Sequence, residues 1–426
     1  MKEAFLQFIW QFQLFNKQGL SLISGEALNV IKPGSINSHA GPDFSQAHIH
    51  FDDLDFYGHV EIHLKSSEWD SHKHQEDPAY NNVILHVVLE NDKEVKNAAG
   101  KLIPTIELRG RIPLNFYQNY EKLINSTQEV PCQSHIEKTN RVILISMMDR
   151  VLIERLEQKS LLFKHVLDKL KGDWEEACFK FILKSFGFKR NKEGFNELAS
   201  KISFKEIKRF TNNKKEIEAI LFGTSGFLKG ERKNDSYFNE IKEVYKRLKL
   251  KFENQSELNP VIWKFFRLRP GNFPTLRLAQ FAAFIHEKEH LLSNILNMET
   301  LADVKSFFND EPSTYWQKHY KFSNETEKGI SKIGDSSIES LIINAIIPIW
   351  VSYSRIRSND SYMDRALKIL EEISPENNKI TRFWKNYTFP NNNAFDSQAL
   401  IHLYNNYCAE RKCLKCNIGV SIVREF

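Results

Sequence analysis

The sequence lacks a long apolar run, and its longest uncharged apolar stretch, residues 341–351, is shorter than the roughly 18 residues of a membrane-spanning helix. Near the start, Phe5, Leu6, Ile9 and Trp10 stand at helical spacing among polar residues, so we expect no secretory signal. These features predict a soluble, cytoplasmic protein that does not bind membranes. A P-loop, a dinucleotide fingerprint and a G-x-S-x-G motif are also missing, so nothing supports an NTPase, a Rossmann dehydrogenase or a serine hydrolase.

Cysteine is scarce, with five in 426 residues, which is too few for a disulfide framework. Three of the five, Cys408, Cys413 and Cys416, lie in the last 19 residues and are close enough in sequence to share one metal ion or cluster. We expect Cys132 to be the fourth ligand, because the neighbours of Cys178 indicate a buried helix position. A [4Fe–4S] cluster or zinc satisfies four thiolates, and unligated thiols are the alternative.

Positive charge is scarce only at the start of the chain. Residues 1–135 contain 11 Lys and Arg against 17 Asp and Glu, a net charge of −6, which leaves +11 for the remainder of a chain whose total is +5. A carboxylate-rich first part suits a cation site, and a basic second part suits a polyanion such as nucleic acid. A solvated surface without such a role is the alternative.

The hydrophobic period changes along the chain. Before about residue 108 it is two, which predicts strands at 47–51, 59–65, 83–89 and 101–108, the third of them a central strand. After about residue 141 it is 3.6, which predicts helices over 142–170, 174–186, 236–252, 276–295 and 338–357.

The predicted fold class is α+β, with an N-terminal mixed β-sheet domain followed by a mainly α-helical region. Because prolines at 104, 113 and 131 mark the change of period, we expect a β-rich domain over residues 1–130 and a basic helical region over 131–426.

Histidine is concentrated in the predicted sheet, since eight of the 14 histidines lie within residues 39–86. Odd positions of the 59–65 strand share one face, so His59, Glu61, His63 and Lys65 should project together. Such a row can hold a metal or a reacting group. It can also be the wet face of a half-buried sheet.

Three further histidines lie nearby. His72 and His74 form an H-x-H pair whose rings point the same way in an extended chain, an arrangement common in transition-metal sites, although two surface histidines are the alternative. His86 lies in an otherwise apolar strand, so we expect a hydrogen-bonded core histidine, with an inner-site ligand as the alternative.

Asp43 precedes a predicted hairpin and stands 18 residues before Glu61, a spacing that resembles the PD-(D/E)XK nuclease core. In that core the Asp and Glu bind divalent cations, and the residue two after the Glu, usually Lys, positions or deprotonates the attacking water. The resemblance implies Asp43 and Glu61 as ligands of Mg²⁺ or Mn²⁺. The H-x-H pair, independently of the resemblance, adds His72 and His74 as further candidate ligands. His63 takes the lysine position, and Lys65 follows on the same face.

A wider set of residues resembles a bacterial family, domain of unknown function 2851. It includes Gly41-Pro42-Asp43-Phe44, the 58–63 strand, residues 267–274, residues 396–398 and the cysteines of the tail. The resemblance implies a family and brings no activity with it.

Arg267, Arg269 and Arg277 surround a turn that leads into a predicted helix. Arginines near a helix start oppose the helix dipole, so we expect them to form a phosphate-binding corner for nucleic acid. Salt bridges to the acidic first domain are the alternative.

These observations favour a metal-dependent nuclease that hydrolyses phosphodiester bonds, with DNA a better candidate than RNA. Asp43 and Glu61 would hold the metal, and His63 or Lys65 would position the nucleophile. A non-catalytic nucleic-acid or protein scaffold with a degenerate nuclease fold is one alternative. A zinc-dependent hydrolase of a small substrate, using the histidines, is another. The sequence leaves the oligomeric state open.

Overall fold

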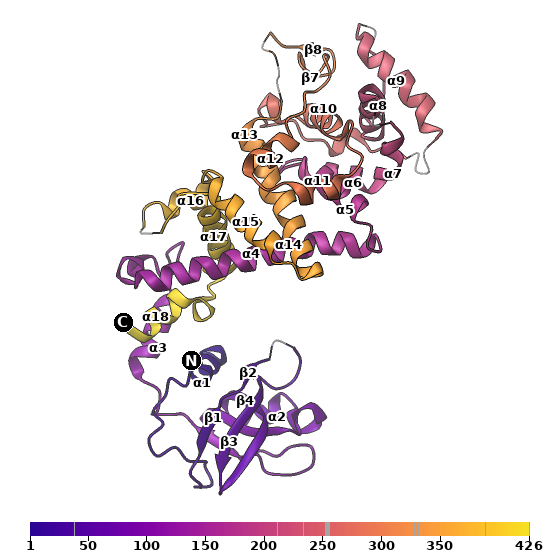
Figure 1. Ribbon diagram of the computed structural model, residues 1–426. Coiled ribbons are helices and arrows are strands. Elements are labelled where there is room, and N and C mark those ends of the chain that lie inside the picture. The colour runs from indigo at the N-terminus through magenta and orange to yellow at the C-terminus, as the bar shows by residue number, and fades with distance from the viewer. Residues whose placement is uncertain are drawn as a thin grey trace. The chain divides into compact units, whose positions relative to one another are not determined.

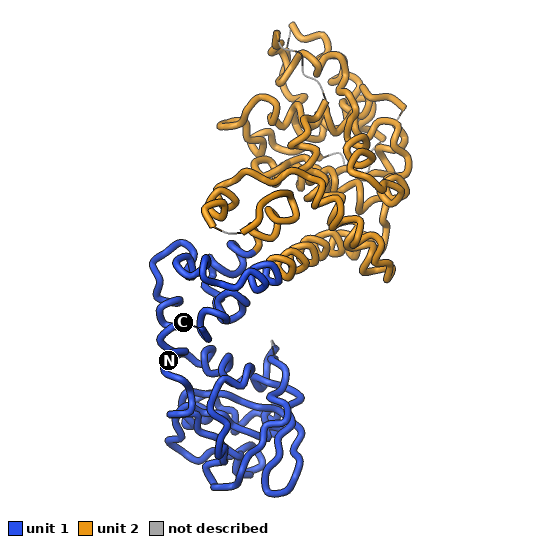
Figure 2. Tube along the Cα trace, turned by 60° about the vertical axis from the view of Figure 1, so that its left-hand side comes forward, with its two compact units in different colours: residues 1–147, 403–426 blue, residues 148–402 orange. Residues whose placement is uncertain are grey.

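The computed structural model describes residues 1–37, 39–210, 212–232, 234–251, 256–327, 329, 332–387 and 389–425. The chain divides into two compact units (Figure 2). Unit 1 contains residues 1–147 and 403–426, and unit 2 contains residues 148–402. The C-terminal residues therefore return to the unit that holds the N-terminus, and the division is not a simple cut of the chain at one point.

Unit 1 is built on a six-stranded mixed sheet (Figure 1). Its path is β1-β3-β4-β5-β6, and β2 pairs with β3. The β3–β4 pair is antiparallel, and the β4–β5 and β5–β6 pairs are parallel. The strands are β1 (Asn29–Lys32), β2 (Ser35–Ile36), β3 (Phe44–Phe51), β4 (Leu54–Lys65), β5 (Val83–Glu90) and β6 (Thr105–Glu107).

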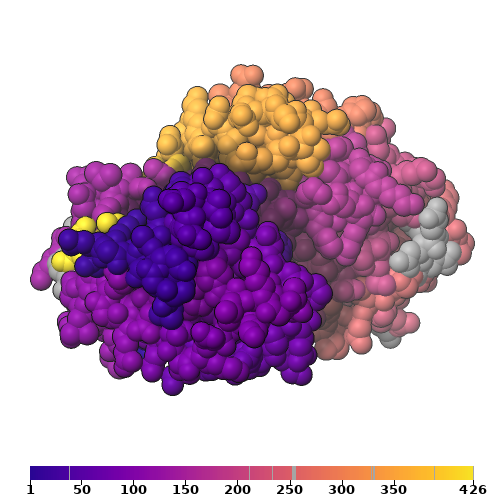
Figure 3. All heavy atoms as spheres, turned by 90° about the horizontal axis from the view of Figure 1, so that it is seen from below, coloured from indigo at the N-terminus to yellow at the C-terminus, as the bar shows by residue number. Residues whose placement is uncertain are grey.

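Helix α1 (Glu3–Gln11) packs on β4 with a continuous apolar side, because Phe5, Leu6, Phe8, Ile9 and Trp10 are all buried. In Figure 3 the indigo residues from the start of the chain lie beside the purple residues that follow them in sequence. The remaining helices of unit 1 are α2 (Glu68–Ser71), α3 (Leu114–Ile124), the start of α4 (Arg141–Lys169) and α18 (Asn417–Glu425).

Among the residues that the structure describes in unit 2, the regular elements are helices apart from one small hairpin. The hairpin is β7 (His319–Lys321) and β8 (Asn324–Glu325). The helices are α5 (Trp174–Ser185), α6 (Lys192–Lys201), α7 (Phe204–Ile207), α8 (Lys214–Thr224), α9 (Ser236–Lys249), α10 (Pro274–Ile285), α11 (Leu291–Asn297), α12 (Leu301–Phe307), α13 (Asp335–Leu341), α14 (Ile347–Arg357), α15 (Ser361–Glu372), α16 (Lys379–Trp384) and α17 (Ala394–Leu403).

The α+β class, the mixed N-terminal sheet and the helical remainder are confirmed. β5 is an interior strand, as its two apolar faces predict. The strand predicted over 101–108 is shorter, since only Thr105–Glu107 pairs with β5. Pro104, just before it, has no N–H to donate, although its carbonyl accepts from the backbone N–H of His86.

The single helix predicted over 276–295 is wrong, because α10 ends at Ile285 and α11 starts at Leu291. Glu287 between them has a left-handed backbone (φ 61°). The new helix start is capped from outside, since both carboxylate oxygens of Glu175 accept backbone N–H groups, from Leu291 at 2.8 Å and Leu292 at 3.2 Å. A cap supplied by a distant helix leaves no trace in the local pattern.

The helix predicted over 338–357 exists but contains a π-helical turn at Ile342–Ile346, directly before Pro348 in α14. Proline cannot donate the regular helical hydrogen bond, and a π turn accommodates that loss. The stretch Asp335–Arg357 is long and apolar enough to cross a membrane by length and composition alone, yet 67% of its most apolar window is buried inside the protein. The core helix of a globular unit has the same properties.

Candidate metal centre

Two carboxylates are held together at the start of β3 and the middle of β4. The backbone N–H of Asp43 donates to Oε2 of Glu61 at 2.9 Å, and the N–H of Ile62 donates to Oδ2 of Asp43 at 3.1 Å. Gln7 of α1 donates from Nε2 to Oδ1 of Asp43 at 2.9 Å. The register that pairs Phe44 with Val60 brings the two carboxylates side by side, as the sequence spacing predicts.

Three imidazoles converge next to Glu61. One ring nitrogen from each of His63, His72 and His74 lies within 4.8 Å of the other two, and this is the one such set of three His, Cys or carboxylate ligand atoms among the residues that the structure describes. Nε2 of His63 lies 3.1 Å from Nδ1 of His72. Oε1 of Glu61 lies 3.2 Å from Nε2 of His74 and 3.6 Å from Nε2 of His63.

The Nε2 atom of His74 is buried and has no hydrogen-bond partner among the described residues, even though Glu61 is close. A buried polar atom without a partner is costly, and a metal ion would satisfy it. The rings of His72 and His74 meet although their segment is not extended, because Lys73 between them takes a left-handed conformation (φ 60°). His72 is exposed, so solvent reaches the centre on its side.

The strand face that carries these groups is covered, because Glu61 is 5% exposed and His63 is 1% exposed. The interpretation as a wet sheet face therefore does not hold for these two residues. At the two ends of the row, His59 is half-buried and Lys65 is exposed at the end of β4, where Glu90 is its register partner. His59 and Lys65 therefore lie outside the candidate metal centre formed around His63, His72 and His74.

Burial keeps the rings of two of these histidines, His63 and His86, uncharged. Burial and the neighbouring histidines lower the pKa of His63 to about 2, so its ring is neutral and able to bind a metal at pH 7. Burial also lowers the pKa of His86 to about 3. Nε2 of His86 lies 2.9 Å from Nδ1 of His63, which agrees with the interpretation of His86 as a hydrogen-bonded core histidine.

Burial shifts the pKa values of the neighbouring carboxyl groups upward, which favours their neutral form. Burial, followed by the negative charge of Glu61, raises the pKa of Asp43 to about 7. Burial and Glu61 also raise the pKa of Glu3. A divalent cation beside these carboxylates would offset their mutual repulsion.

Aromatic side chains fix the ring of His74. Tyr80 stacks on it with 3.8 Å between ring centroids, and Trp69 meets it edge-on at 5.3 Å. Trp69 also donates from Nε1 to the carbonyl of Lys96 at 3.0 Å, which holds the indole in place. A ligand held in this way is already oriented before a metal binds.

Sequence reasoning missed the contribution of α1. Glu3 and Gln7 lie one helical turn apart, and Gln7 donates to Glu3 Oε1 at 3.1 Å as well as to Asp43. The apolar period predicted this helix, but no local pattern indicates which strand its polar face meets. Tyr80 was also missed, because its role comes only from stacking on His74.

The four cysteines named from the sequence come together in unit 1, and each is buried. Burial raises the pKa of Cys132, and the neighbouring Cys416 and Cys413 raise it further. The pKa of Cys408 is likewise raised by burial and then by Cys132, Cys416 and Cys413. Cys408 closes a π-helical turn (Tyr404–Cys408), a feature that often accompanies functional sites. Cys178 is also buried, but it lies in α5 of unit 2.

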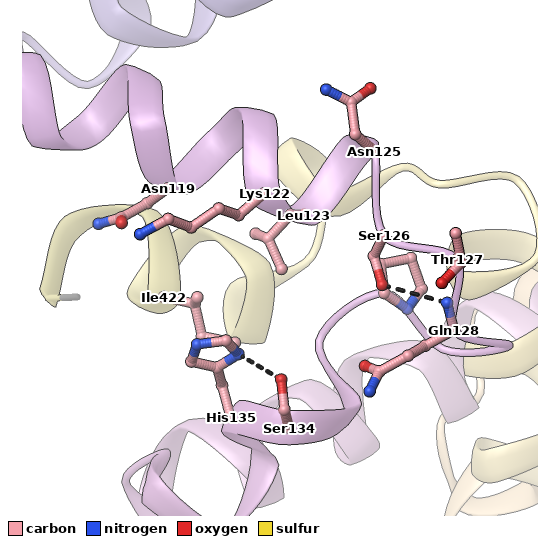
Figure 4. Close-up of a pocket in the computed structure, with 11 residues that line it drawn as sticks. Asn119, Lys122, Leu123, Asn125, Ser126, Thr127, Gln128, Ser134, His135 and Ile422 are labelled. Atoms are coloured by element: carbon pink, nitrogen blue, oxygen red, sulfur yellow. Dashed lines mark hydrogen bonds between the residues drawn. The ribbon is translucent and has the colours of Figure 1, made fainter.

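Unit 1 also contains a cavity of about 510 Å³, shown in Figure 4. α3 supplies Asn119, Lys122 and Leu123 to its wall, and α18 supplies Ile422. Pro131 and Ser134, which flank Cys132 closely in the chain, also line it. The lining residues include no carboxylate and no thiol, so the cavity does not contain the candidate centre.

The three arginines expected to form one corner differ in how far their side chains are exposed to solvent. Arg267 and Arg269 are exposed, whereas Arg277 is 4% exposed. Arg267 has a left-handed backbone (φ 59°) and lies over the ring of Phe266. Arg277 therefore has a different environment, and its bonds are with neutral groups of unit 2.

Comparison with known proteins gives a family. No curated protein and no solved structure matches the chain. A family model described as protein of unknown function (DUF2851) matches residues 3–379, which include the whole histidine and carboxylate centre and end before Cys408. The chain belongs to the DUF2851 family.

Proposed function

We propose that the protein is a metal-dependent hydrolase of nucleic-acid phosphodiester bonds, with its metal held by His63, His72, His74 and Glu61. The observation that carries the proposal is the position of Glu61 Oε1, 3.2 Å from the unpartnered Nε2 of His74 and 3.6 Å from Nε2 of His63. The Glu61 carboxylate and the His63 imidazole share one buried face of β4, and the rings of His72 and His74 approach from the segment that follows. Imidazoles and a carboxylate form a ligand set for a divalent metal.

The ligand types favour Mn²⁺ or Zn²⁺ over Mg²⁺, because imidazole suits transition metals and Mg²⁺ prefers oxygen ligands. Asp43 supports the site as a second carboxylate, held by Gln7 and Ile62. A bound metal would polarise a phosphoryl oxygen and lower the pKa of its water, with the exposed side at His72 open to substrate. The net positive charge of the chain beyond residue 135 supports a polyanionic substrate.

The test is incubation of the purified protein with single- and double-stranded DNA and RNA in the presence of Mn²⁺, Zn²⁺ or Mg²⁺. Glu61→Gln and Asp43→Asn should each reduce metal-dependent cleavage by at least 100-fold, while His59→Asn, on the same strand but outside the centre, should cleave at the wild-type rate. Cleavage by Glu61→Gln at the wild-type rate would overturn the proposal.

A zinc hydrolase of a small substrate is the second candidate, and the three-histidine set favours it because catalytic zinc is often bound by three protein ligands. It predicts zinc-dependent hydrolysis of small phosphate or carboxylate esters with no cleavage of nucleic acid. Tight nucleic-acid binding without turnover and without metal would instead select the non-catalytic scaffold.

We also propose that Cys132, Cys408, Cys413 and Cys416 hold a metal centre, either a [4Fe–4S] cluster or zinc. Four thiolates around one zinc ion lie about 3.8 Å apart, from Zn–S bonds of about 2.3 Å. A [4Fe–4S] cluster is held by four thiolates in the same way. Anaerobic purification followed by iron, sulfide and zinc analysis decides between them. Cys408→Ser should lose the metal, and Cys178→Ser should retain it.

A further inference from the structure

A cavity of about 270 Å³ in unit 2 lies between three segments of the chain. The turn after α5, at residues 186–191, forms one wall. The start of α10 supplies Pro274 and Arg277, and α13 supplies three serines, Ser336, Ser337 and Ser340. None of these residues belongs to the candidate metal centre or to the cysteine group.

Arg277 is the unusual member of this lining. Among the described residues its side chain donates to neutral oxygens alone, at 2.8 Å to Oε1 of Gln280, 2.6 Å to Oδ1 of Asn272 and 2.8 Å to Oγ of Ser337. Its Nε is buried and has no hydrogen-bond partner among the described residues. The guanidinium lies 4.4 Å from the centre of the Phe188 ring.

A buried guanidinium normally has a carboxylate partner, because an unpaired charge inside a protein costs several kcal/mol. Burial lowers the pKa of Arg277 to about 10, and no carboxylate among the described residues raises it. The side chain therefore remains positively charged at pH 7 without a counter-ion. Glu339 of α13 does not supply one, since it pairs with Lys305 at 3.1 Å.

The remaining charge at the cavity is also positive. Lys189 and Arg190 line it and are exposed, which places them at its mouth. The serines of α13 offer hydroxyl donors, and the N-cap of α10, Phe273, has no side-chain acceptor for the helix N–H groups. Each of these features favours an anion.

We propose that this cavity binds a phosphate monoester, with Arg277 as its buried cation and Lys189 and Arg190 at the mouth. Arg is suited to two parallel hydrogen bonds to phosphate oxygens, and Nε of Arg277 is a donor that has no acceptor among the described residues. A cavity of about 270 Å³ has room for a phosphate with an attached sugar. The site is independent of the proposed hydrolase activity.

The phosphate can belong to a small metabolite or to the end of a nucleic-acid strand, and three probes separate these sources. They are inorganic phosphate, a nucleoside 5′-monophosphate, and a pair of oligonucleotides that differ only in a 5′-phosphate. Binding to the full-length protein is measured by calorimetry and by the shift in melting temperature, without divalent metal so that no hydrolysis occurs. Preference for the 5′-phosphorylated oligonucleotide identifies a strand end as the ligand, and preference for the mononucleotide identifies a small molecule.

Arg277→Gln should weaken phosphate-dependent binding by at least 30-fold, and Lys189→Ala by 3- to 10-fold. The matched control is Arg365→Gln, because Arg365 also contacts aromatic rings in unit 2 but donates to the carbonyls of Leu296 and Met298. Arg365→Gln should bind like the wild type. If Arg277→Gln fails to fold, Lys189→Ala decides, since Lys189 is exposed. Absence of binding by the wild type to all three probes would overturn the proposal. Wild-type affinity in both Lys189→Ala and a folded Arg277→Gln protein would overturn it as well.

Discussion

Replacement of His86 by phenylalanine tests whether the centre is organised to bind metal. His86 is fully buried, and its Nε2 lies 2.9 Å from Nδ1 of His63. To bind a metal through Nε2, His63 must carry its proton on Nδ1 and donate it to His86. Phenylalanine has similar bulk but cannot accept this hydrogen bond.

The substitution has two calculable consequences. It leaves the Nδ1–H of His63, a residue only 1% exposed, without an acceptor, which costs about 1–3 kcal/mol of unfolding free energy. Loss of the partner that orients a metal-binding histidine typically weakens metal binding by roughly 10- to 100-fold. That range corresponds to about 1.4–2.7 kcal/mol of binding free energy.

The assay is titration of the protein with Co²⁺, followed by its visible absorption, and competition with Zn²⁺. His59→Phe is the matched control, because His59 lies on the same strand but outside the three-histidine set. We expect the control to bind metal with wild-type affinity. A folded His86→Phe protein that binds Co²⁺ as tightly as the wild type would show that His86 does not orient His63, and the reasoning would fail.

Two further predictions concern stability and the cysteine site. Burial raises the pKa of Glu218, which accepts a hydrogen bond from the hydroxyl of Tyr237, from an ordinary 4.5 to about 7, so folding favours its protonated form. The stabilising contribution of protonated Glu218 is present below pH 4.5 and is lost as pH rises through 7, by up to about 3 kcal/mol. Glutamine does not ionise, so in melting experiments the Glu218→Gln protein should gain stability relative to the wild type between pH 5 and pH 8. An equal difference at both pH values would contradict this. Gly419→Ala would place its Cβ 2.2 Å from the carbonyl oxygen of Cys413, so the backbone at Cys413 would have to move. Metal analysis of this variant should therefore show loss of the thiolate-bound metal. The control is Gly271→Ala, which has open space around its Cβ and should retain the metal.

The sheet and several helices could be predicted from hydrophobic period alone, because period two and period 3.6 reflect which face of each element is buried. The predicted helices over 142–170 and 174–186 agree with α4 and α5 to within a residue at each end. The 276–295 prediction is wrong because the cap on Leu291 comes from Glu175, more than a hundred residues earlier.

In the candidate centre, too, the features set by local sequence pattern could be predicted, and those set by other parts of the chain could not. The shared face of Glu61 and His63 and the closeness of Asp43 follow from strand alternation and hairpin spacing, and the structure brings these residues together. The approach of His74 depends on the left-handed turn at Lys73, a conformation with no clear sequence signal when the residue is not glycine. The isolation of Arg277 from Arg267 and Arg269 was not predictable, because helical spacing does not reveal which side chain is buried by a later segment of the chain.

The most direct test of the account is an anomalous-difference map from crystals grown with Mn²⁺, recorded with X-rays at which manganese scatters anomalously. The account predicts a strong peak within bonding distance of the four proposed ligands, through ring nitrogens of His63, His72 and His74 and through Oε1 of Glu61. A map with well-ordered side chains, ample Mn²⁺ in the crystal and no peak at this position would contradict it.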